Sequence, residues 1–513
     1  MMPTHPPSAR AALIKILSVA FLFSIIFMMT SSGLIALLEG STRFLQPVLN
    51  ENAANETIEA VNALREKPDL EAITAVSIEL GYMSQLTSVE RFNDSRLPEH
   101  GIYLASMPKL NQLLMLGHVL LGVFCLIIGG LQFWPNFRKK YMKTHRLLGG
   151  LYVVTAPLSV VLALIYLGLT PPHAIYAHLV AWFALWIFGV LAIVSIIMAI
   201  RALRQRKLME HQAWMALSFA SLIVAPMLRW CWVLLGMMLP TIDQETINQV
   251  TLAIMLPLVL MMGYGLLLIN RQFTRPNSKR PAAAIADRIR LKVFATMPIW
   301  YGLVILIASI NALAWFFHDG TLQLVPSTLI PELLIDQETM VFQRHSWLGL
   351  LLTLSSSTAL WLALVLLKQM FDSRMDRHKA FVIRSQFIAT NITAGLLVFV
   401  GYSIGIEPQL QNASGGTTYT VAGLLLALFS LYFYAAFRKG YFAIMKEALI
   451  FQLAILPFNA LLFSGLWIVY TLSLPADYIE LGQGYLLPAG SSFALLFFAM
   501  IYVIYGQATR EHN

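Results

Sequence analysis

Charged residues are scarce in this sequence. They make up 12% of its 513 residues, whereas a soluble globular chain has about 25%, and residues 147–198 contain none. A soluble globular fold is therefore excluded. The hydrophobic fraction is 58%, and an apolar run of about 20 residues crosses the ~30 Å hydrocarbon core as a helix. Because the alternation of a transmembrane β-barrel is absent as well, we predict an all-α polytopic membrane protein.

Cysteine is nearly absent too. The two cysteines, Cys125 and Cys231, lie in apolar segments, which excludes a disulfide framework and a cysteine-based metal site. We expect them to be small buried hydrophobic side chains. No nucleotide or flavin motif occurs, so any reductant must come from a partner or a small molecule. The net charge of +9 does not indicate a nucleic-acid partner, because Lys and Arg concentrate in links between apolar runs, as the positive-inside rule expects.

The apolar runs predict about twelve transmembrane helices. Basic residues gather in every second link, which predicts a bacterial inner-membrane protein with both termini in the cytoplasm. The first run is longer than a signal-peptide core, and no small-residue cleavage site follows it cleanly, so we predict that it is retained. The predicted spans cover residues 13–38, 112–134, 145–167, 173–200, 211–238, 250–269, 293–317, 345–367, 379–402, 419–437, 448–472 and 486–505.

These features divide the chain into five regions. Residues 1–38 hold the first transmembrane helix, and residues 39–111 form a small helical cap outside the membrane. Residues 112–270 form a bundle with four histidines, 271–292 a basic cytoplasmic linker, and 293–513 a second bundle that partly repeats the first. The cap carries eleven acidic and six basic residues. Its composition suits a lid, a docking surface or a simple spacer.

Part of the first bundle recurs in the second. His178 and His211 are 33 residues apart, and so are His345 and His378. The His-x-Ala-aromatic start of residues 211–218 recurs at 378–385 without a gap. This spacing predicts that spans four to six are duplicated as spans eight to ten, as in many membrane proteins. The alternative is a chance alignment of two long apolar helices.

Four consecutive spans each carry a histidine near one end. Because neighbouring spans run in opposite directions, His118 and His178 are expected towards the outside (the outer pair), and His145 and His211 towards the inside (the inner pair). Each pair comes from alternate helices of one four-helix bundle. Such helices face one another diagonally if the bundle closes in sequence order.

The two pairs suggest a cofactor. Two imidazoles that face each other across a bundle core can hold a haem iron, and an ionisable side chain inside a membrane indicates function by default. We therefore hypothesise two b-type haems, with the four histidines as their metal ligands. For any single histidine, the alternative is an interfacial side chain at a helix end. His173 competes with His178, which we prefer because it lies deeper and matches His345 in the repeat.

Two glycines support this hypothesis weakly. Gly122 and Gly149 each follow a histidine by one helical turn and share its face, so a missing side chain there leaves room for a flat macrocycle. Close packing of helices through small residues explains both glycines equally well. Arg146 and Lys143 could pair with haem propionates, or could serve only as topology charges.

The second bundle offers fewer candidates. It keeps His345 and His378, but neither has a partner histidine. We interpret them as a degenerate copy that lost its cofactor, or as a quinone or lipid site. Arg384 lies one to two turns into its span and is a candidate partner for an anionic group.

The motifs around the four histidines resemble an uncharacterised bacterial family of predicted membrane proteins of unknown function. They read His118-x-x-Leu-Gly122, Gln132-Phe-Trp-Pro135, His145-Arg-Leu-Leu-Gly149 and His211-x-x-Trp-Met215. The family signature is His-Arg-x-Trp-Met-x-Arg-Ser. Its two arginines are replaced here by Gln212 and Leu217, while Arg384 and Ser385 restore the last pair in the second copy. The resemblance covers about residues 110–240 and extends more faintly over residues 345–400. It implies no activity.

Four helices with crossed histidine pairs are also similar in architecture to transmembrane di-haem b-type cytochromes, which reduce ascorbate-derived or ferric substrates or pass electrons to quinones. This analogy implies transmembrane electron transfer between an unknown donor and an unknown acceptor, with a quinone as one candidate. A secondary transporter also fits twelve spans with a duplicated half, although few carboxylates are buried and no matched pair of broken helices occurs. A non-catalytic scaffold that uses the cap is the third interpretation. Whether the chain is an enzyme stays open, and the lipid bilayer is the one partner that every interpretation shares.

Overall fold

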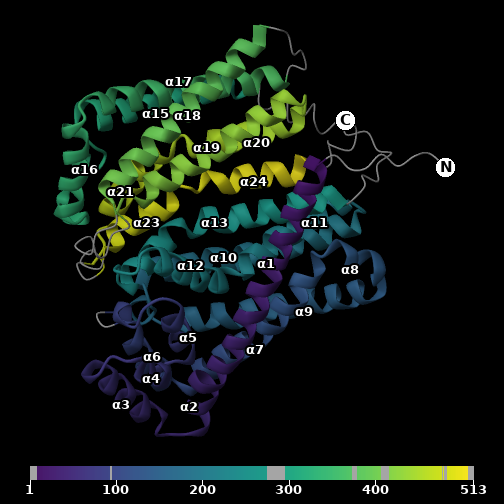
Figure 1. Cartoon of the computed structure of the whole chain (residues 1–513), viewed down its shortest axis with the longest axis vertical. Coiled ribbons are helices and arrows are strands. Elements are labelled where there is room, and N and C mark those ends of the chain that lie inside the picture. The colour runs from purple at the N-terminus through teal and green to yellow at the C-terminus, as the bar shows by residue number, and fades with distance from the viewer. Residues whose placement is uncertain are drawn as a thin grey trace. The chain divides into compact units, whose positions relative to one another are not determined.

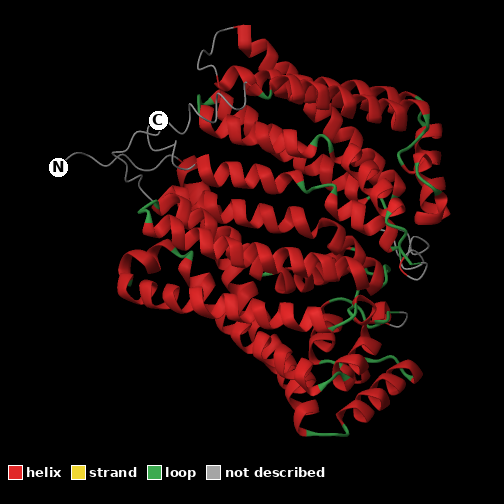
Figure 2. Ribbon diagram, turned by 180° about the vertical axis from the view of Figure 1, so that it is seen from behind, coloured by secondary structure: helices red, strands yellow, loops and turns green. Residues whose placement is uncertain are grey.

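The computed structural model describes residues 9–92, 95–273, 295–371, 378–405, 415–475, 478 and 482–506. Within these ranges every regular element is a helix and none is a strand (Figure 2). Eleven described helices are long and apolar enough to cross a membrane, or up to twelve if a bent pair counts as one span. The predicted all-α polytopic membrane fold is confirmed. The basic linker at 271–292 lies outside the described residues beyond position 273.

The chain packs into two compact units. Unit 1 comprises Met1–Tyr176, Ala181–Gln244 and Met261–Arg275, and unit 2 comprises Ala177–Val180, Glu245–Leu260 and Pro276–Asn513. The boundary therefore falls inside two long helices, α10 (His178–Arg204) and α13 (Gln244–Phe273).

Unit 1 begins with a long apolar helix and the cap. Helix α1 (Ala9–Gly40) continues through a π-helical turn, Ser41–Leu45, into α2 (Gln46–Leu49). The cap that follows contains α3 (Ala53–Glu66), α4 (Leu70–Val76), α5 (Ile78–Leu86) and α6 (Leu97–Ser106). Two of these helices begin at side-chain caps, because Asp69 accepts the amide of Ala72 at 2.9 Å and Ser77 accepts that of Leu80 at 3.1 Å.

A buried arginine attaches the cap to the rest of unit 1. Arg91 is 3% exposed; its Nε donates to the carbonyl of Ile242 at 3.1 Å, and its NH2 donates to Gln244 Oε1 at 2.8 Å. Burial lowers the pKa of this guanidinium, which nevertheless stays charged at neutral pH. A Cβ on Gly236 would lie 2.5 Å from the Arg91 guanidinium carbon, so the helix before Ile242 needs glycine there.

The histidine bundle of unit 1 follows the cap. It consists of α7 (Lys109–Gln132), the short basic α8 (Pro135–Lys140), α9 (Met142–Leu169), α10 and α11 (Leu208–Leu222). Helices α7 and α9 lie side by side (Figure 1) and run antiparallel. Their contacts include Cys125 Sγ on Thr155 Oγ1 at 3.2 Å and a 2.9 Å bond from Ser159 Oγ to the carbonyl of His118.

The fifth predicted span is broken in the middle. Helices α11 and α12 (Val224–Met238) meet at 59° around Ile223. Pro226 explains the break, because its ring carries no N–H for the carbonyl one turn earlier. At the repeat offset, residue 393 is a threonine, whose hydroxyl bonds its own helix at Ala389 O at 2.9 Å, and α18 (His378–Ile404) is one continuous helix. The two aligned segments therefore differ in shape.

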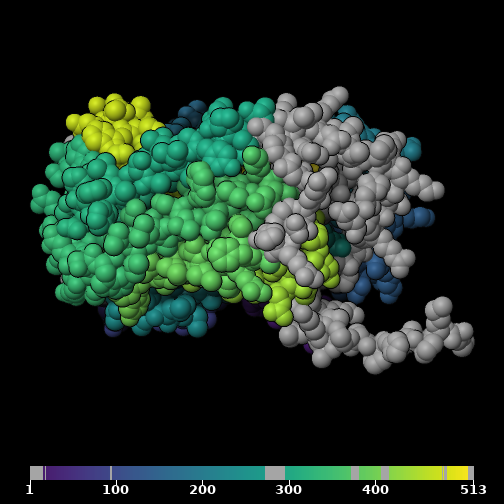
Figure 3. Space-filling view, turned by 90° about the horizontal axis from the view of Figure 1, so that it is seen from above, coloured from purple at the N-terminus to yellow at the C-terminus, as the bar shows by residue number. Residues whose placement is uncertain are grey.

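Unit 2 is a second all-helical body, whose closest helix pair is α18 with α19. The long helices of unit 2 expose large apolar side chains such as Leu350, Leu354 and Ile388, as expected where helices face lipid. Figure 3 shows the surface that the teal and green segments of this unit form. Besides part of α13 and α18, unit 2 holds α15 (Met297–Asn311), the π-helical turn η4 (Ala312–Phe317), η5 (Leu322–Leu324), α16 (Glu332–Arg344), α17 (Trp347–Phe371), α19 (Thr417–Arg438), α20 (Phe442–Ile455), α21 (Phe458–Thr471), α23 (Gln483–Ser491) and α24 (Leu495–Tyr505).

Candidate functional site

The structure brings the inner pair together at one end of the unit 1 bundle. Helices α9 and α11 both start at this end, and two turns beyond the histidines the Tyr152 hydroxyl lies 3.3 Å from Ser218 Oγ. His145 and His211 are therefore at the same level. Their imidazoles also interact electrostatically. His145 and His211, which come from alternate helices, thus lie at the same end of the bundle, and their role as ligands stays a prediction.

The hydrogen bonding of the inner-pair rings determines which of their nitrogens could serve as ligands. His211 Nδ1 lies 3.0 Å from the carbonyl oxygen of Ala199 on α10. A carbonyl accepts only from a protonated nitrogen, so the neutral ring keeps its lone pair on Nε2, the usual arrangement in metal-bound histidines. His145 Nδ1 is buried and has no hydrogen-bond partner among the described residues. Both rings can therefore offer a nitrogen to a ligand.

Two further side chains lie near this pair. The sequence predicted no site role for either, although Gln132 begins the Gln132-Phe-Trp-Pro135 motif. Arg138 on α8 acts electrostatically on both His145 and His211, and burial lowers the pKa of its guanidinium without a described carboxylate to offset the charge. Gln132 at the end of α7 is 8% exposed, and its Nε2 has no partner in the described part of the chain. The basic link contained the signal for Arg138, but it contained four other cations as well.

Arg146, one of the two cations that the sequence offered either as a partner for haem propionates or as a topology charge, is exposed. It acts on His145 less strongly than Arg138 does. The half-buried Arg138 is therefore the better placed of the two to meet an anion beside the imidazoles. Lys143 is exposed as well.

The two glycines of the histidine motifs do not open a slot. A Cβ on Gly122 would lie 3.6 Å from Ser159 Oγ, and one on Gly149 would lie 3.4 Å from Gln132 Oε1. These are ordinary or slightly tight contacts with the neighbouring helix. Close packing, the alternative interpretation of these glycines, is what the structure supports.

The structure does not place His118 level with the start of α10, as the predicted outer pair would require. His118 Nδ1 lies 3.0 Å from the carbonyl of Ser159 and 3.1 Å from its hydroxyl, so its ring packs on α9, the next span in sequence. Trp182, one turn after His178, donates to the carbonyl of Leu167 at 3.1 Å. That carbonyl lies about 12 Å beyond Ser159 along α9, at 1.5 Å per residue. The start of α10 is therefore not level with His118, and His178 itself groups with unit 2.

The candidates of the second bundle lie apart from one another. His345 is half-buried at the end of α16, with its ring 5.2 Å from that of Phe399 and 6.0 Å from that of Trp347. Arg384 is exposed near the other end of α18 from Phe399. His378 begins α18, and its side chain lies outside the described residues. No common site of these three emerges.

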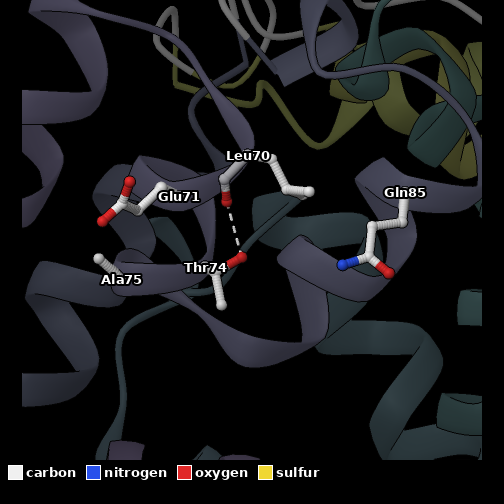
Figure 4. A pocket seen from close by; sticks show the side chains of 5 residues that line it. All are labelled: Leu70, Glu71, Thr74, Ala75 and Gln85. Atoms are coloured by element: carbon white, nitrogen blue, oxygen red, sulfur yellow. Dashed lines mark hydrogen bonds between the residues drawn. The ribbon is translucent and has the colours of Figure 1, made fainter.

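The cap carries a shallow open hollow at α4 and α5 (Figure 4). Its lining residues are Leu70, Glu71, Thr74, Ala75 and Gln85, and the Thr74 hydroxyl already bonds the Leu70 carbonyl at 2.7 Å. Nothing about this hollow points to a cofactor. Across the described ranges, no group of three or more His, Cys, Asp or Glu side chains is placed to hold a metal ion.

The comparison with known proteins identifies a matching family for part of the chain, and no activity is known for this family. No curated protein matches this chain, and no solved structure does. Residues 115–266, which run from α7 into α13 and contain both histidine pairs, match the family described as "Predicted membrane protein (DUF2306)". The resemblance to a family of predicted membrane proteins of unknown function is thereby confirmed for this part of the chain.

Proposed function

We propose that unit 1 binds one b-type haem between His145 and His211, and that the chain is a membrane redox protein. The observation that carries the proposal is the inner pair itself: two imidazoles at one level on alternate helices, each with a nitrogen available for a ligand. A single haem is proposed because His118 and the start of α10 lie at different levels.

The residues around the inner pair suit a ligand of this chemistry. A bound haem would supply one-electron redox chemistry, and His145 and His211 would be the residues that hold its iron. The carbonyl of Ala199 orients the His211 ring and fixes its tautomer. Arg138 offers a positive charge and Gln132 Nε2 offers a buried donor, and both would suit the carboxylates of such a ligand.

An absorption experiment tests this proposal directly. The full chain is produced with an adequate haem supply and purified in detergent, and its dithionite-reduced minus oxidised spectrum and haem content are measured. We expect sharp reduced bands and about one haem per chain in the wild type. His145→Leu and His211→Leu should each abolish haem binding.

Two variants serve as controls. His118→Leu and His173→Leu remove half-buried and exposed histidines outside the inner pair, so both should keep the wild-type haem content. Haem-free wild-type protein, or haem that persists in both inner-pair variants, would refute the proposal. A second haem that disappears with His118 would instead restore the outer site.

A further inference from the structure

A carboxylic acid is completely buried in unit 2. Glu338 on α16 is 0% exposed, and no basic side chain acts on it in the described part of the chain. An ionised carboxylate without a cation is costly in such a place, while a neutral acid is not. The molecule therefore holds a titratable group at a position where its charge has no counter-charge.

The protein surrounds this carboxyl with hydrogen-bonding groups. The Tyr419 hydroxyl on α19 lies 2.5 Å from Glu338 Oε1, and the amide of Leu322 donates to Oε2 at 2.8 Å. Gly320 adopts φ +148°, and a Cβ there would lie 2.5 Å from Oε2. Only glycine lets this loop close over the acid.

From Tyr419 a chain of buried hydrogen bonds continues into the transmembrane helices. Tyr419 OH lies 3.2 Å from Thr321 Oγ1, which donates to Asn459 Oδ1 at 2.5 Å. Asn459 Nδ2 donates to Asn311 Oδ1 at 3.0 Å, and Asn311 Nδ2 donates to Ser356 Oγ at 3.4 Å. Each of these side chains is at most 2% exposed. The chain thus links α16 through α19 and α21 to α15 and α17.

The direction of this chain depends on one proton. The Tyr419 hydroxyl has a single hydrogen and two acceptors within reach, Glu338 Oε1 and Thr321 Oγ1. When Glu338 is ionised, the hydroxyl must donate to the carboxylate. When Glu338 is protonated at Oε1, the acid donates to Tyr419, and the hydroxyl is free to donate to Thr321.

We propose that Glu338 is a proton-binding site of unit 2, and that its occupancy sets the direction of the Tyr419 hydroxyl at the head of the buried hydrogen-bond chain. The ligand is a proton rather than a metal ion because both carboxyl oxygens already have hydrogen-bonding neighbours, the Tyr419 hydroxyl at Oε1 and the Leu322 amide at Oε2. In the described ranges, no group of three or more His, Cys, Asp or Glu side chains is placed to hold a metal ion there.

Few other titratable groups lie on the elements around Glu338, and Tyr419 is the one that contacts it. Tyr485 on α23 is buried beside Tyr419 and donates to the Gly415 carbonyl at 3.3 Å. The charged or titratable side chains on the neighbouring described elements are exposed or half-buried, and none of them acts on the carboxyl: Glu332, Asp336 and Arg344 on α16, His318 and Asp319 in the preceding loop, and Arg384 and Tyr402 on α18.

Infrared difference spectroscopy of the full chain in nanodiscs tests the proposal. The carbonyl band of a protonated carboxylic acid is followed as the pH is raised, in wild type, Glu338→Gln and Glu332→Gln. We expect a wild-type band that titrates well above the range of exposed carboxyls, because burial raises the pKa of Glu338. The band should vanish in Glu338→Gln and persist in Glu332→Gln, which changes an exposed acid on the same helix.

A second variant keeps the test decisive if Glu338→Gln does not fold. Tyr419→Phe retains the acid but removes a donor that favours its ionised form. Its titration midpoint should rise by about one to two pH units, the value of a lost hydrogen bond to a charged group. An unchanged midpoint in Tyr419→Phe, or a wild-type acid that titrates like an exposed carboxyl, would overturn the proposal.

Discussion

Gly349 gives the sharpest stability prediction, because its neighbour is main chain rather than a flexible side chain. The residue lies in the first turn of α17. A Cβ added there would overlap the carbonyl oxygen of Trp315 and lie 2.7 Å from its carbonyl carbon. Trp315 belongs to the π-helical turn η4, whose backbone cannot rotate away as a side chain would. The substitution Gly349→Ala must therefore push α17 and η4 apart.

The magnitude follows from what this separation would disturb. Leu348 and Leu352 flank the contact and are 0% exposed, so a shift of about 1 Å loosens a fully packed layer. Overpacking of a core by one methyl group costs about 1–3 kcal/mol, and we expect the upper end because the clash is with main chain. The matched control is Gly395→Ala in α18, where a Cβ meets nothing within 4 Å. It should stabilise the helix by about 0.5–1 kcal/mol, because alanine is the better helix former.

Thermal unfolding in detergent, followed by circular dichroism, checks this pair of variants. The expected result is a melting temperature below that of wild type for Gly349→Ala and at or slightly above it for Gly395→Ala. If Gly349→Ala melts with the wild type, the close approach of α17 to η4 is wrong.

Three further predictions concern charge. Arg91→Met should lower the free energy of unfolding by about 2–4 kcal/mol, because it removes two hydrogen bonds of a buried cation and leaves their acceptors unpaired. Lys67→Met, the control at an 86% exposed side chain, should unfold with the wild type. Burial raises the pKa of Glu338 in the folded protein above its ordinary value of 4.5. The protonated acid should therefore contribute fully to the free energy of unfolding below pH 4.5, and this contribution should be lost as the pH rises through the folded-state pKa. A free energy of unfolding that instead grows between these two pKa values would contradict the assignment of Glu338 as a buried proton-binding acid. In haem-loaded protein, Arg138→Gln should lower the midpoint potential by something on the order of tens of millivolts, since a nearby positive charge favours the reduced form, and by more than the exposed Arg146→Gln does; equal shifts in a redox titration would show that Arg138 is not at the site.

The membrane fold could be predicted because it depends on properties that sequence carries directly. Long apolar runs without charge must be helical in lipid, and their ends alternate with basic links. The break at Ile223 was harder to see. Pro226 marks it, but transmembrane helices often tolerate proline, so the residue alone does not distinguish a kink from a straight span.

The site was only partly predictable, for geometric reasons. Alternating direction sufficed to place His145 and His211 at one end of the bundle. It did not reveal that α10 begins beyond the level of His118, because the vertical offset between two helices depends on loop length and packing. Nor could it choose Arg138 from a run of five cations, since that choice depends on how the short α8 folds back towards the imidazoles.

The Glu338 cluster left no trace in the sequence pattern. Its members come from segments up to 148 residues apart, and α16 carries other acids that are exposed. From the sequence, a carboxyl in such a helix is predicted to lie on its solvent-exposed face. Only the tertiary structure shows that one of these acids turns inward under the Gly320 loop.

The bond between Arg91 and the carbonyl of Ile242 has a consequence for synthesis. The two residues are separated by 151 positions, so a ribosome that adds about 5–20 residues per second makes the acceptor roughly 8–30 s after the donor. During that interval several hydrophobic segments must enter the bilayer, while the Arg91 guanidinium of the newly made cap stays hydrated. The hydrogen bond between Arg91 and Ile242 is therefore formed late in biogenesis, after the segments between the two residues have been inserted.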